Sequence, residues 1–338
     1  MPFAQFLRRL GFAAIVVAGV AVITFAISHL IPGDPARMVA GDRASDEIIA
    51  HIRQVMGLDR SLPVQFAIYL RDLLHGDLGV SLRTGRPVAQ DIATFLPATL
   101  ELGLVSLILA VVVGIPLGVA SAVHKDGPID QLARTVSVAG ISMPVFWLGL
   151  ILILVFYADL DLLPIGGRLS DDVLPPERIT GFMLIDTLIA GDPEAFRSAL
   201  AHLVLPASVL GFAQLGTITR QIRASMLDAL QEDYVRTARA NGLRPASIVF
   251  GHALRNALIP SVTLLGLLFG DLLYGAVLTE TVFAWPGIGT YVVNSIQSLD
   301  FPAIMGFTLI ASVGYVLINL GVDFIYLALD PQLRRAAS

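Results

Sequence analysis

The stretch "ATLELGLVSLILAVVVGIPLGVASA", Ala98–Ala122, decides the fold class of this chain. Glu101 is its single charged residue, and apart from Thr99 and two serines the rest are apolar residues, glycine or proline. A helix of this length, at 1.5 Å per residue, spans the hydrocarbon core of a bilayer, which is about 30 Å thick. Similar runs recur along the chain, whose hydrophobic fraction is 55% and whose mean hydropathy is +0.77. The sequence therefore predicts an all-α integral membrane protein.

Five further runs have the length and composition of membrane-spanning helices, so we predict six transmembrane helices in all. They are Leu10–Ile31, Thr135–Ala158, His202–Thr219, Ala257–Thr279 and Pro302–Leu329. The run from His202 is short and contains Pro206, which membrane helices tolerate because neighbouring helices satisfy the freed backbone groups.

A cleaved signal peptide is the alternative for the first run, because Arg8 and Arg9 precede it. The run is longer than the apolar region of a signal peptide, which has about 7–15 residues, and no small-x-small site ends it. We therefore expect an uncleaved span.

The distribution of basic residues predicts the orientation of the spans. With the N-terminus in the cytoplasm, the inner segments carry twelve of the 22 lysines and arginines beside six acidic residues. Arg8, Arg9, Lys125 and Arg134 all fall in short inner flanks, which determine topology most strongly. Both termini are therefore expected in the cytoplasm.

The spans divide the chain into three parts. Residues 1–31 form a cytoplasmic tail and the first span, residues 32–97 an extracytoplasmic segment, and residues 98–338 the transmembrane core. Charged pieces with a helical pattern, such as "SDEIIAHIRQVMG", predict that the extracytoplasmic segment is helical. A large cytoplasmic loop, residues 220–256, is expected between the fourth and fifth spans.

This loop contains "QEDYVRTARANGLRP", Gln231–Pro245, which is densely charged for a chain with 14% charged residues. Apolar side chains recur at three- and four-residue steps from Ser225 to Ala238, which predicts an amphipathic helix. Gly242 is expected to end this helix, since glycine adopts a positive φ without steric cost, and Pro245 to begin a second one. A helix lying on lipid headgroups is the alternative. Its polar face mixes acids with bases, which suits a groove on another protein better.

The stretches "DYVRTARANGL" and "HALRNALIP" resemble the signature cytoplasmic loop of binding-protein-dependent ABC importer permeases, in the form typical of the dipeptide and oligopeptide branch. Many permeases of this superfamily have Glu-Ala-Ala, three residues and then glycine. Here Arg236, Thr237, Ala238 and Gly242 occupy these positions, so the leading Glu-Ala is absent. The resemblance continues in the same order over nearly the full chain, with "IPGDPA", "GDLGVSL", "SMPVFWLGLILILVF", "ETVFAWPGIG" and "DFIYLALDP".

In that family the loop inserts a short coupling helix into a cleft of an ATP-binding subunit. The resemblance implies that this chain is a non-catalytic pore subunit of an ATP-driven importer of dipeptides or oligopeptides, multi-pass in the bacterial cytoplasmic (inner) membrane. Ala238 and Gly242 would permit close approach of the partner, and arginines could pair with its acids. The implied ATPase-coupling residues are Asp233, Tyr234, Arg236, Thr237, Ala238, Arg239, Gly242 and Leu243.

The resemblance also implies the partners, which are a second homologous permease subunit, two ATP-binding subunits, an extracytoplasmic substrate-binding protein and the lipid bilayer. Residues 32–97 are expected to touch the substrate-binding protein, and a folded cap without that contact is the alternative. The sequence contains no GxxxxGK[ST] phosphate loop, so ATP and Mg²⁺ are expected on partner subunits and no cofactor on this chain. Neither a nucleic-acid-binding stretch nor metal-ligand spacing of the six histidines is evident.

Five residues are candidates for the transport pathway or its outer gate: Asp271, Glu280, Trp285, Pro286 and Gly287. Asp271 lies inside the fifth span, where a charge costs about 2.5–3.5 kcal/mol, so it is expected to face a water-filled pathway or a polar partner. A structural hydrogen bond to a neighbouring helix is the alternative. The other four follow that span and are expected in a re-entrant turn, with Trp285 anchored at the membrane interface, that gates the pore or supports the helices.

Two pairs of glycines have the spacing that lets membrane helices approach closely. These pairs are Gly114 with Gly118 and Gly266 with Gly270. Packing within the chain is the default expectation, and a dimer interface lined by the fifth span is the alternative.

Other functions are weighed against peptide import. Importers of the same architecture for glutathione or nickel are alternatives, because a separate receptor selects the substrate. An ion-coupled secondary transporter is less favoured, since only Asp271 and Asp323 supply suitable charges within the spans. An intramembrane enzyme is disfavoured, since the HExxH and GxSxG motifs are absent.

Overall fold

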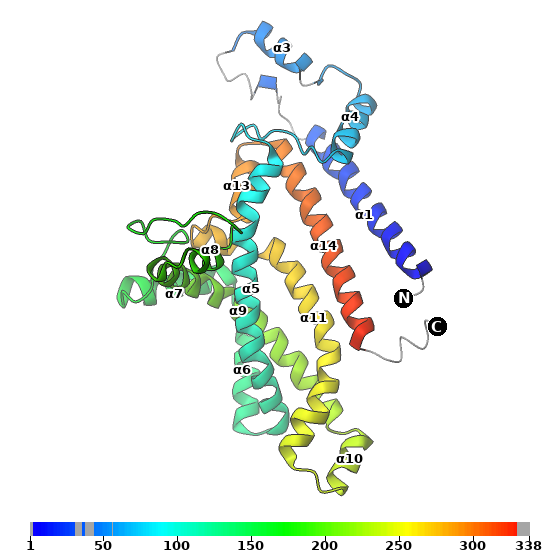
Figure 1. The fold of residues 1–338 in the computed structure, drawn as a ribbon, viewed down its shortest axis with the longest axis vertical. Coiled ribbons are helices and arrows are strands. Elements are labelled where there is room, and N and C mark those ends of the chain that lie inside the picture. The colour runs from blue at the N-terminus through cyan, green and yellow to red at the C-terminus, as the bar shows by residue number, and fades with distance from the viewer. Residues whose placement is uncertain (1–2, 31–35, 38–43, 56, 330–338) are drawn as a thin grey trace.

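The computed structural model describes residues 3–30, 36–37, 44–55 and 57–329. Within these residues the chain is helical, apart from turns and one isolated antiparallel bridge between Val80 and Pro87. Figure 1 shows long helices packed side by side, with shorter helices at the two ends and on one flank. The elements are α1 (Phe3–Leu30), α3 (Asp46–Val55), α4 (Leu62–Leu74), α5 (Val88–Val123), α6 (Pro128–Ser142), α7 (Val145–Leu152), the π-helix η1 (Ile153–Asp159), α8 (Met183–Ala190), α9 (Pro193–Ala229), α10 (Asp233–Ala240), the π-helix η2 (Ser247–Ala253), α11 (Leu254–Gly275), α12 (Val277–Val282), α13 (Ile288–Gln297) and α14 (Phe301–Leu329).

Five helical segments of the described chain are long and apolar enough to cross a membrane, and six if a bent pair forms one span. The predicted all-α fold is confirmed, and the predicted number of six spans is reached when the bent pair counts as one span. The second and fourth spans are longer than predicted, because α5 has 36 residues and α9 has 37. Hydropathy marks only the apolar middle of such a helix. The Asp192 carboxylate, which accepts hydrogen bonds from two backbone N–H groups, caps the start of α9 in a polar flank.

The third span, predicted as one helix over Thr135–Ala158, is broken. Helix α6 ends at Ser142, α7 begins at Val145, and the two axes differ by 105°. Pro144 explains the break, since proline lacks a backbone N–H and disfavours helical conformation in the residue before it. Met143 accordingly has an extended conformation, with φ −76° and ψ 127°. The chain is therefore sharply bent at this point and does not form one straight helix over Thr135–Ala158.

Glycines bring α5 into direct contact with the backbone of α9. A Cβ atom added at Gly118 would lie 2.8 Å from the Thr219 carbonyl oxygen, and one at Gly114 would lie 3.1 Å from Ile218. Thr219 also donates its hydroxyl to the Gly114 carbonyl, at 3.3 Å. The expectation that Gly114 and Gly118 serve packing within the chain is confirmed.

Helix α6 crosses α9 just as closely, through one glycine on each helix. A Cβ atom at Gly140 would lie 2.6 Å from the Phe212 carbonyl oxygen, and one at Gly216 would lie 2.5 Å from the Ser137 carbonyl oxygen. Real Cβ atoms are not found this close to an oxygen, so both positions require glycine. Helix α9 is thus held between α5 and α6 with backbone against backbone.

The second glycine pair, on α11, packs against α14. A Cβ atom at Gly270 would lie 2.9 Å from the Tyr315 ring, and one at Gly266 would overlap the side chain of Val322. This pair is therefore covered by the chain itself, and the alternative that it lines a dimer interface is not supported.

The described residues of segment 32–97, which is predicted to be extracytoplasmic, fall into two parts that differ in their attachment. Helix α4 rests on the end of α1, where His29 and Gln65 form a hydrogen bond of 3.0 Å. Residues 79–91, by contrast, are bound into the core. The Ser81 hydroxyl donates to buried Asp300 at 2.5 Å, and Arg86 pairs with buried Asp91 at 2.5 Å. The boundary predicted at residue 97 therefore falls inside α5, which begins at Val88.

We expect Gly216→Val to destabilise the fold, because its side chain would overlap the Ser137 carbonyl of α6. Overpacking of this kind costs about 1–3 kcal/mol. Thermal unfolding of the purified chain in detergent measures the loss. Gly19→Val on α1 is the matched control, since no atom of the described chain lies within 4 Å of a Cβ there. Equal shifts in the two variants would contradict the close packing of α6 on α9.

Candidate functional site

The charged loop between α9 and α11 lies at the opposite end of the molecule from α3 and α4 (Figure 1). Helix α9 ends at Ala229, α10 begins at Asp233, and a new helix begins at Pro245. The predicted arrangement of helix, glycine turn and second helix is therefore present. The prediction that one helix runs on from Ser225 is wrong. The chain turns after Ala229, and Glu232 has an extended backbone, with φ −66° and ψ 151°, that starts α10 in a new direction.

The turn after α10 depends on Gly242. Its φ is +75°, in the left-handed region that glycine adopts without a steric penalty. The Gly242 N–H donates to the Arg239 carbonyl at 3.0 Å, and the Leu243 N–H donates to the Ala238 carbonyl at 3.2 Å. These two bonds define a Schellman motif, which closes the helix end. The sequence-based assignment of Gly242 to the helix end is correct.

The apolar stripe of α10 faces the chain itself. Val235 and Ala238 are buried together with Ile248 of η2, and Tyr234 and Leu243 pack half-buried at the edge of this cluster. Ala238 is only 8% exposed, so its small side chain serves packing inside the loop. The prediction that Ala238 presents a small surface to a partner is therefore not supported. The cluster joins α10 and η2 into one packed unit.

The other face of α10 is open to solvent. The exposed candidates are Asp233, Arg236, Thr237, Arg239 and Gly242. Arg236 forms an ion pair with Asp233 at 3.2 Å, in which the two side chains are 73% and 93% exposed. Such an exposed pair contributes at most about 1 kcal/mol, so the guanidinium is available to an acidic partner.

A buried ion pair holds α6 to α9 close to the loop, and sequence reasoning missed it. Arg223 of α9 donates from Nε and Nη2 to the two carboxylate oxygens of Asp130, at 2.6 and 2.8 Å. Asp130 is fully buried and also accepts from Ser121 at 2.5 Å and from the Asp126 N–H at 3.0 Å. Four donors on one carboxylate compensate for its burial. The opposite charges of the two predicted inner segments were the only hint of this contact in the sequence. Asp130 and Arg223 lie 93 positions apart.

At the other end of the core, Glu280 organises the hairpin formed by α12 and α13. Its carboxylate accepts the Thr99 hydroxyl of α5 and, at 2.9 Å, the Thr290 N–H. Thr99 in turn accepts the Ile288 N–H at 2.8 Å. The first N–H groups of α13 are thus capped by side chains from outside the helix, and a carboxylate at a helix N-terminus is favoured by the helix dipole. Because Glu280 is 0% exposed, burial raises the pKa of its carboxyl.

Two further candidates shape this hairpin. A Cβ atom at Gly287 would overlap the Glu280 carboxylate, so glycine is required there. Pro286 separates the buried Trp285 from this glycine and lines an open pocket of about 500 Å³. The hairpin is a compact turn between two short helices, packed against α5. These contacts favour helix support as the role of Glu280 and Gly287.

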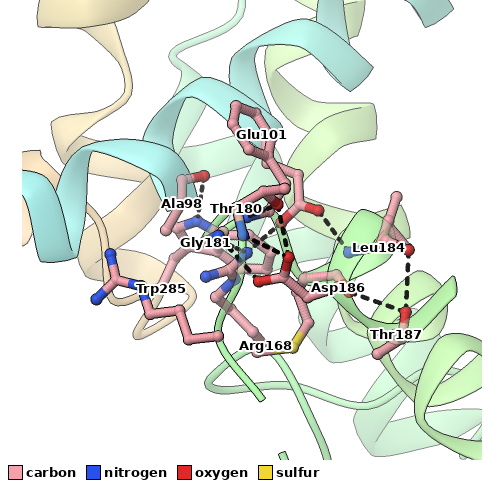
Figure 2. A network of polar contacts seen from close by, with 12 residues as sticks. Ala98, Glu101, Arg168, Thr180, Gly181, Leu184, Asp186, Thr187 and Trp285 are labelled. Atoms are coloured by element: carbon pink, nitrogen blue, oxygen red, sulfur yellow. Dashed lines mark hydrogen bonds and ion pairs between the residues drawn. The ribbon is translucent and has the colours of Figure 1, made fainter. Parts of the chain in front are cut away.

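Trp285 does not anchor the hairpin at the membrane interface, because it is 1% exposed. Its indole N–H donates to the Ala98 carbonyl of α5 at 2.9 Å. Figure 2 shows Trp285 beside Arg168, whose guanidinium carbon lies 5.7 Å from the centre of the indole ring. Arg168 pairs with Glu101 at 2.5 Å, and Glu101 also accepts the Leu184 N–H at 2.7 Å. Glu101, the single charged residue of the second predicted span, is therefore neutralised by Arg168 inside the protein.

Asp186 extends this polar network toward α8 (Figure 2). It accepts the Thr180 N–H and hydroxyl at 2.8 and 2.6 Å, and the Gly181 N–H at 2.9 Å. Burial acts to raise the pKa of the Asp186 carboxyl, but these hydrogen bonds outweigh it, so the pKa is lowered. Arg168 donates to the Gly181 carbonyl at 3.0 Å, which joins the two networks. Sequence reasoning did not single out Arg168 or Asp186.

Asp271, the remaining candidate, lies in the last part of α11 and is exposed on the isolated chain. The structure therefore does not place it in a buried hydrogen bond within the chain. The side chain of Asp323 lies outside the described residues. Among the described residues, no three histidine or acidic side chains are grouped so that they could hold a metal ion.

Comparisons with known proteins extend over the whole chain. A sequence model of the family described as binding-protein-dependent transport system inner membrane component matches residues 114–335. A second model, of the N-terminal part of such membrane components, matches residues 3–103. Both the predicted transmembrane core and the segment that precedes it, residues 32–97, therefore have family counterparts.

Three relatives illustrate the similarity. The chain is 59% identical to the probable D,D-dipeptide transport system permease protein DdpB of Escherichia coli strain K12, over 99% of both chains. It is 44% identical to the dipeptide transport system permease protein DppB of the same strain, over 97% of this chain and 98% of that one. It is 41% identical to the glutathione transport system permease protein GsiC of Pectobacterium atrosepticum, over 93% of this chain and 94% of that one.

Among solved structures, a chain of the MetNI methionine ABC transporter, in an inward-facing conformation, has a similar fold. The TM-score is 0.51 with 18% sequence identity, and the match covers 69% of this chain and 93% of that chain. At this identity the likeness concerns the fold alone.

The buried carboxyl of Glu280 predicts a pH-dependent stability. Its ordinary pKa is 4.5 and the folded value is higher, so the folded protein keeps this proton where the unfolded chain loses it. The stability that the protonated carboxyl contributes is therefore complete below about pH 4.5 and is lost as the pH rises through the folded pKa. Glu280→Gln cannot ionise, so the unfolding midpoint of the wild type should fall relative to this variant as the pH rises above about 4.5.

Unfolding in detergent at several pH values measures this difference. Glu177→Gln is the control, because Glu177 is exposed and its replacement should leave the pH profile unchanged. A constant difference between the wild type and Glu280→Gln over the whole range would show that burial does not govern this carboxyl.

Proposed function

This chain belongs to the family of binding-protein-dependent transport system inner membrane components, and we propose that it forms half of the translocation pore of an ATP-driven dipeptide importer. The family membership makes it a multi-pass permease component of the inner membrane. In the proposal the second half is a homologous permease subunit, two ATP-binding subunits lie in the cytoplasm, and an extracytoplasmic binding protein delivers the substrate. Dipeptides are the proposed substrate because relatives at 59% and 44% identity carry that substrate in their names.

The observation that carries the coupling part of the proposal is the exposed polar face of α10 at one end of the molecule. Arg236, Thr237 and Arg239 are exposed there, whereas the apolar face of α10 is packed on η2. We assign this polar face to contact with an ATP-binding subunit. The sequence contains no GxxxxGK[ST] phosphate loop, so we assign ATP and Mg²⁺ to those subunits and a non-catalytic role to this chain.

The packing of the loop suggests how a push on α10 reaches the membrane. Val235, Ala238 and Ile248 join α10 to η2, which continues directly into α11. A displacement of α10 therefore moves α11 rather than deforming the loop. At its far end α11 meets the hairpin that Thr99 and Ala98 fix to α5. We propose that α11 pivots near Ala276, between this fixed hairpin and the moving loop, and so alternates access to the pore.

The substrate is tested by uptake into proteoliposomes that hold the full complex. We expect ATP and the binding protein to be required, a D,D-dipeptide or an L,L-dipeptide to be taken up, and ion gradients to have no effect. Glutathione is the second candidate, because a relative at 41% identity is a glutathione permease. Nickel is the third. Uptake driven by a proton or sodium gradient without ATP would overturn the proposal.

We expect Gly242→Val to uncouple ATP hydrolysis from transport. Valine at φ +75° is strained, so the Schellman turn would open and α10 would lose its position on η2. Uptake should fall at least tenfold, while ATP hydrolysis by the complex changes much less. Gly191→Val is the matched control, since Gly191 also has a positive φ of +66° at a helix end but lies after α8. Comparable uptake losses in both variants would argue against a coupling role.

Insertion of the variant can be checked in the same vesicles, because the chain contains no cysteine. A cysteine introduced at Ser247, which is exposed in the same loop but lies outside α10, should react with a membrane-impermeant maleimide from the ATP-accessible side only, with or without Gly242→Val. Reaction from the opposite side would contradict the cytoplasmic assignment of the loop.

A further inference from the structure

Helix α11 has three sides with different surroundings. Its glycines, Gly266 and Gly270, pack on α14, which runs beside it (Figure 1). A second side, with Leu258, Leu265 and Leu268, packs on the core of α5 and α9. The third side is a stripe of residues at steps of three and four, which share one face of a helix. It consists of Thr263, which is half-buried, and four exposed residues: Asn256, Pro260, Leu267 and Asp271.

This stripe does not have the composition of a surface that faces lipid. Three of its five side chains are polar, namely Asn256, Thr263 and Asp271. Polar side chains within a span face the interior of a helix bundle or a water-filled cavity, because acyl chains offer them no hydrogen bonds. The described core lies on the other sides of α11. The stripe is therefore suited to line an aqueous passage, which in the proposed pore lies between this chain and the second permease.

Asp271 lies inside the membrane-spanning part of α11. Ala276, five residues later, packs with Ala98 and Leu102 at the start of the apolar run of α5. At 1.5 Å per residue, Asp271 is about 8 Å closer to the middle of the span along the axis of α11. An ionised carboxylate at this depth requires water or a cation beside it.

The described chain supplies no cation for this carboxylate. Asp271 forms neither a hydrogen bond nor an ion pair with any residue that the structure describes. Residues 256–333 contain no lysine, arginine or histidine, so neither α11 nor the helices after it offer a base. Arg168 and Arg223, which lie in the core, are each already paired with a buried carboxylate. A positive charge beside Asp271 therefore has to come from outside the described chain.

We propose that Asp271 binds the α-ammonium group of the peptide as it crosses the pore, an inference that rests on the proposed function. The amino end of a peptide is a compact cation with three N–H donors, and a carboxylate accepts such charge-assisted hydrogen bonds. A dipeptide spans about 7 Å. Arg255, the nearest base before Asp271, is 16 residues or about 24 Å away, so it does not hold the carboxylate of the same dipeptide. Asp271 thus recognises the amino end alone.

A single cysteine can test for this cation site, because the chain contains none. Leu267→Cys places a thiol one turn before Asp271 in the purified complex with the partner subunits. A cationic methanethiosulfonate (ethyltrimethylammonium) is compared with an anionic one (ethylsulfonate), each relative to its rate with a free thiol, and the mass of this chain measures the reaction. At roughly 6 Å in water one charge changes the rate about threefold for each sign, so the cationic reagent should be favoured about tenfold. Adding Asp271→Asn should abolish this preference.

The same thiol tests the ligand without transport. An excess of alanyl-alanine should slow the reaction of Leu267→Cys at least threefold. N-acetyl-alanyl-alanine, which lacks the ammonium group, should not slow it. With Asp271→Asn added, neither peptide should protect the thiol.

Uptake into proteoliposomes with ATP and the binding protein tests the role in transport. Asp271→Asn should lower dipeptide uptake at least tenfold, because it loses hydrogen bonds to a charged group. Asp271→Glu keeps the carboxylate and should retain most of the uptake, which a merely structural role would not predict. Glu194→Gln is the matched control, since Glu194 is an exposed acid at the start of α9, and should transport normally.

Three results would overturn the proposal. The first is a reaction of Leu267→Cys with neither reagent, which would mean that the stripe is covered in the complex. The second is an equal preference for the two reagents, which would mean that Asp271 is protonated or paired with a base of the second permease. The third is equal protection by the two peptides. Failure of the proposed function is recognised separately, because the wild-type complex would then take up no dipeptide, whereas the labelling needs no transport.

Discussion

The contact of α9 with α5 and α6, backbone against backbone, determines the position of everything else in the core. At Gly118, Gly140 and Gly216 no side chain fits between the helices. Inside a bilayer an apolar side chain gains nothing by leaving lipid for another helix, because both surroundings are apolar. Close packing must therefore determine which helices pair. Near the loop, the Asp130–Arg223 pair joins α6 to α9, and Ser121 of α5 donates to the same carboxylate, so the same three helices are fixed there too. The result is a rigid frame of three helices.

The two candidate functional regions relate to this frame in different ways. The hairpin of α12 and α13 is fastened to α5 by the Trp285, Thr99 and Glu280 bonds, so it belongs to the frame. The loop between α9 and α11 is held chiefly by its own packing of α10 on η2. Between them runs α11, which packs on α14 through its glycines. Helix α11 is fixed at one end by this hairpin and joined at the other end to an exposed loop. This arrangement is suited to motion of α11.

The sequence predicted those features that depend on local chemistry. Apolar runs identified the spans, and Gly242 marked the helix end because its backbone conformation is accessible mainly to glycine. Features that depend on distant partners were missed or misjudged. Trp285 was placed at the membrane interface, but its partner, the Ala98 carbonyl, lies 187 residues away. Glu101 and Arg168 are 67 residues apart and Asp130 and Arg223 are 93 apart, so no periodicity links them. Pro144 was visible in the sequence, but it indicates a break and not the angle of the bend.

The π-helical geometry of η2 has a consequence for the register of the loop. In an α-helix, residues five apart point about 140° away from each other, so Ile248 and Ala253 would face different sides. In a π-helix the bonds run from i to i+5, which stacks such residues nearly above one another. Ile248, which packs on α10, and Ala253, which is buried in the core cluster of α5 and α9, therefore lie on the same side of η2, so that one face of η2 joins the loop to the core. Deleting a single residue here would restore ordinary helical winding and turn Ile248 away from the side of Ala253, so the position of α10 relative to α11 depends on the length of this short segment.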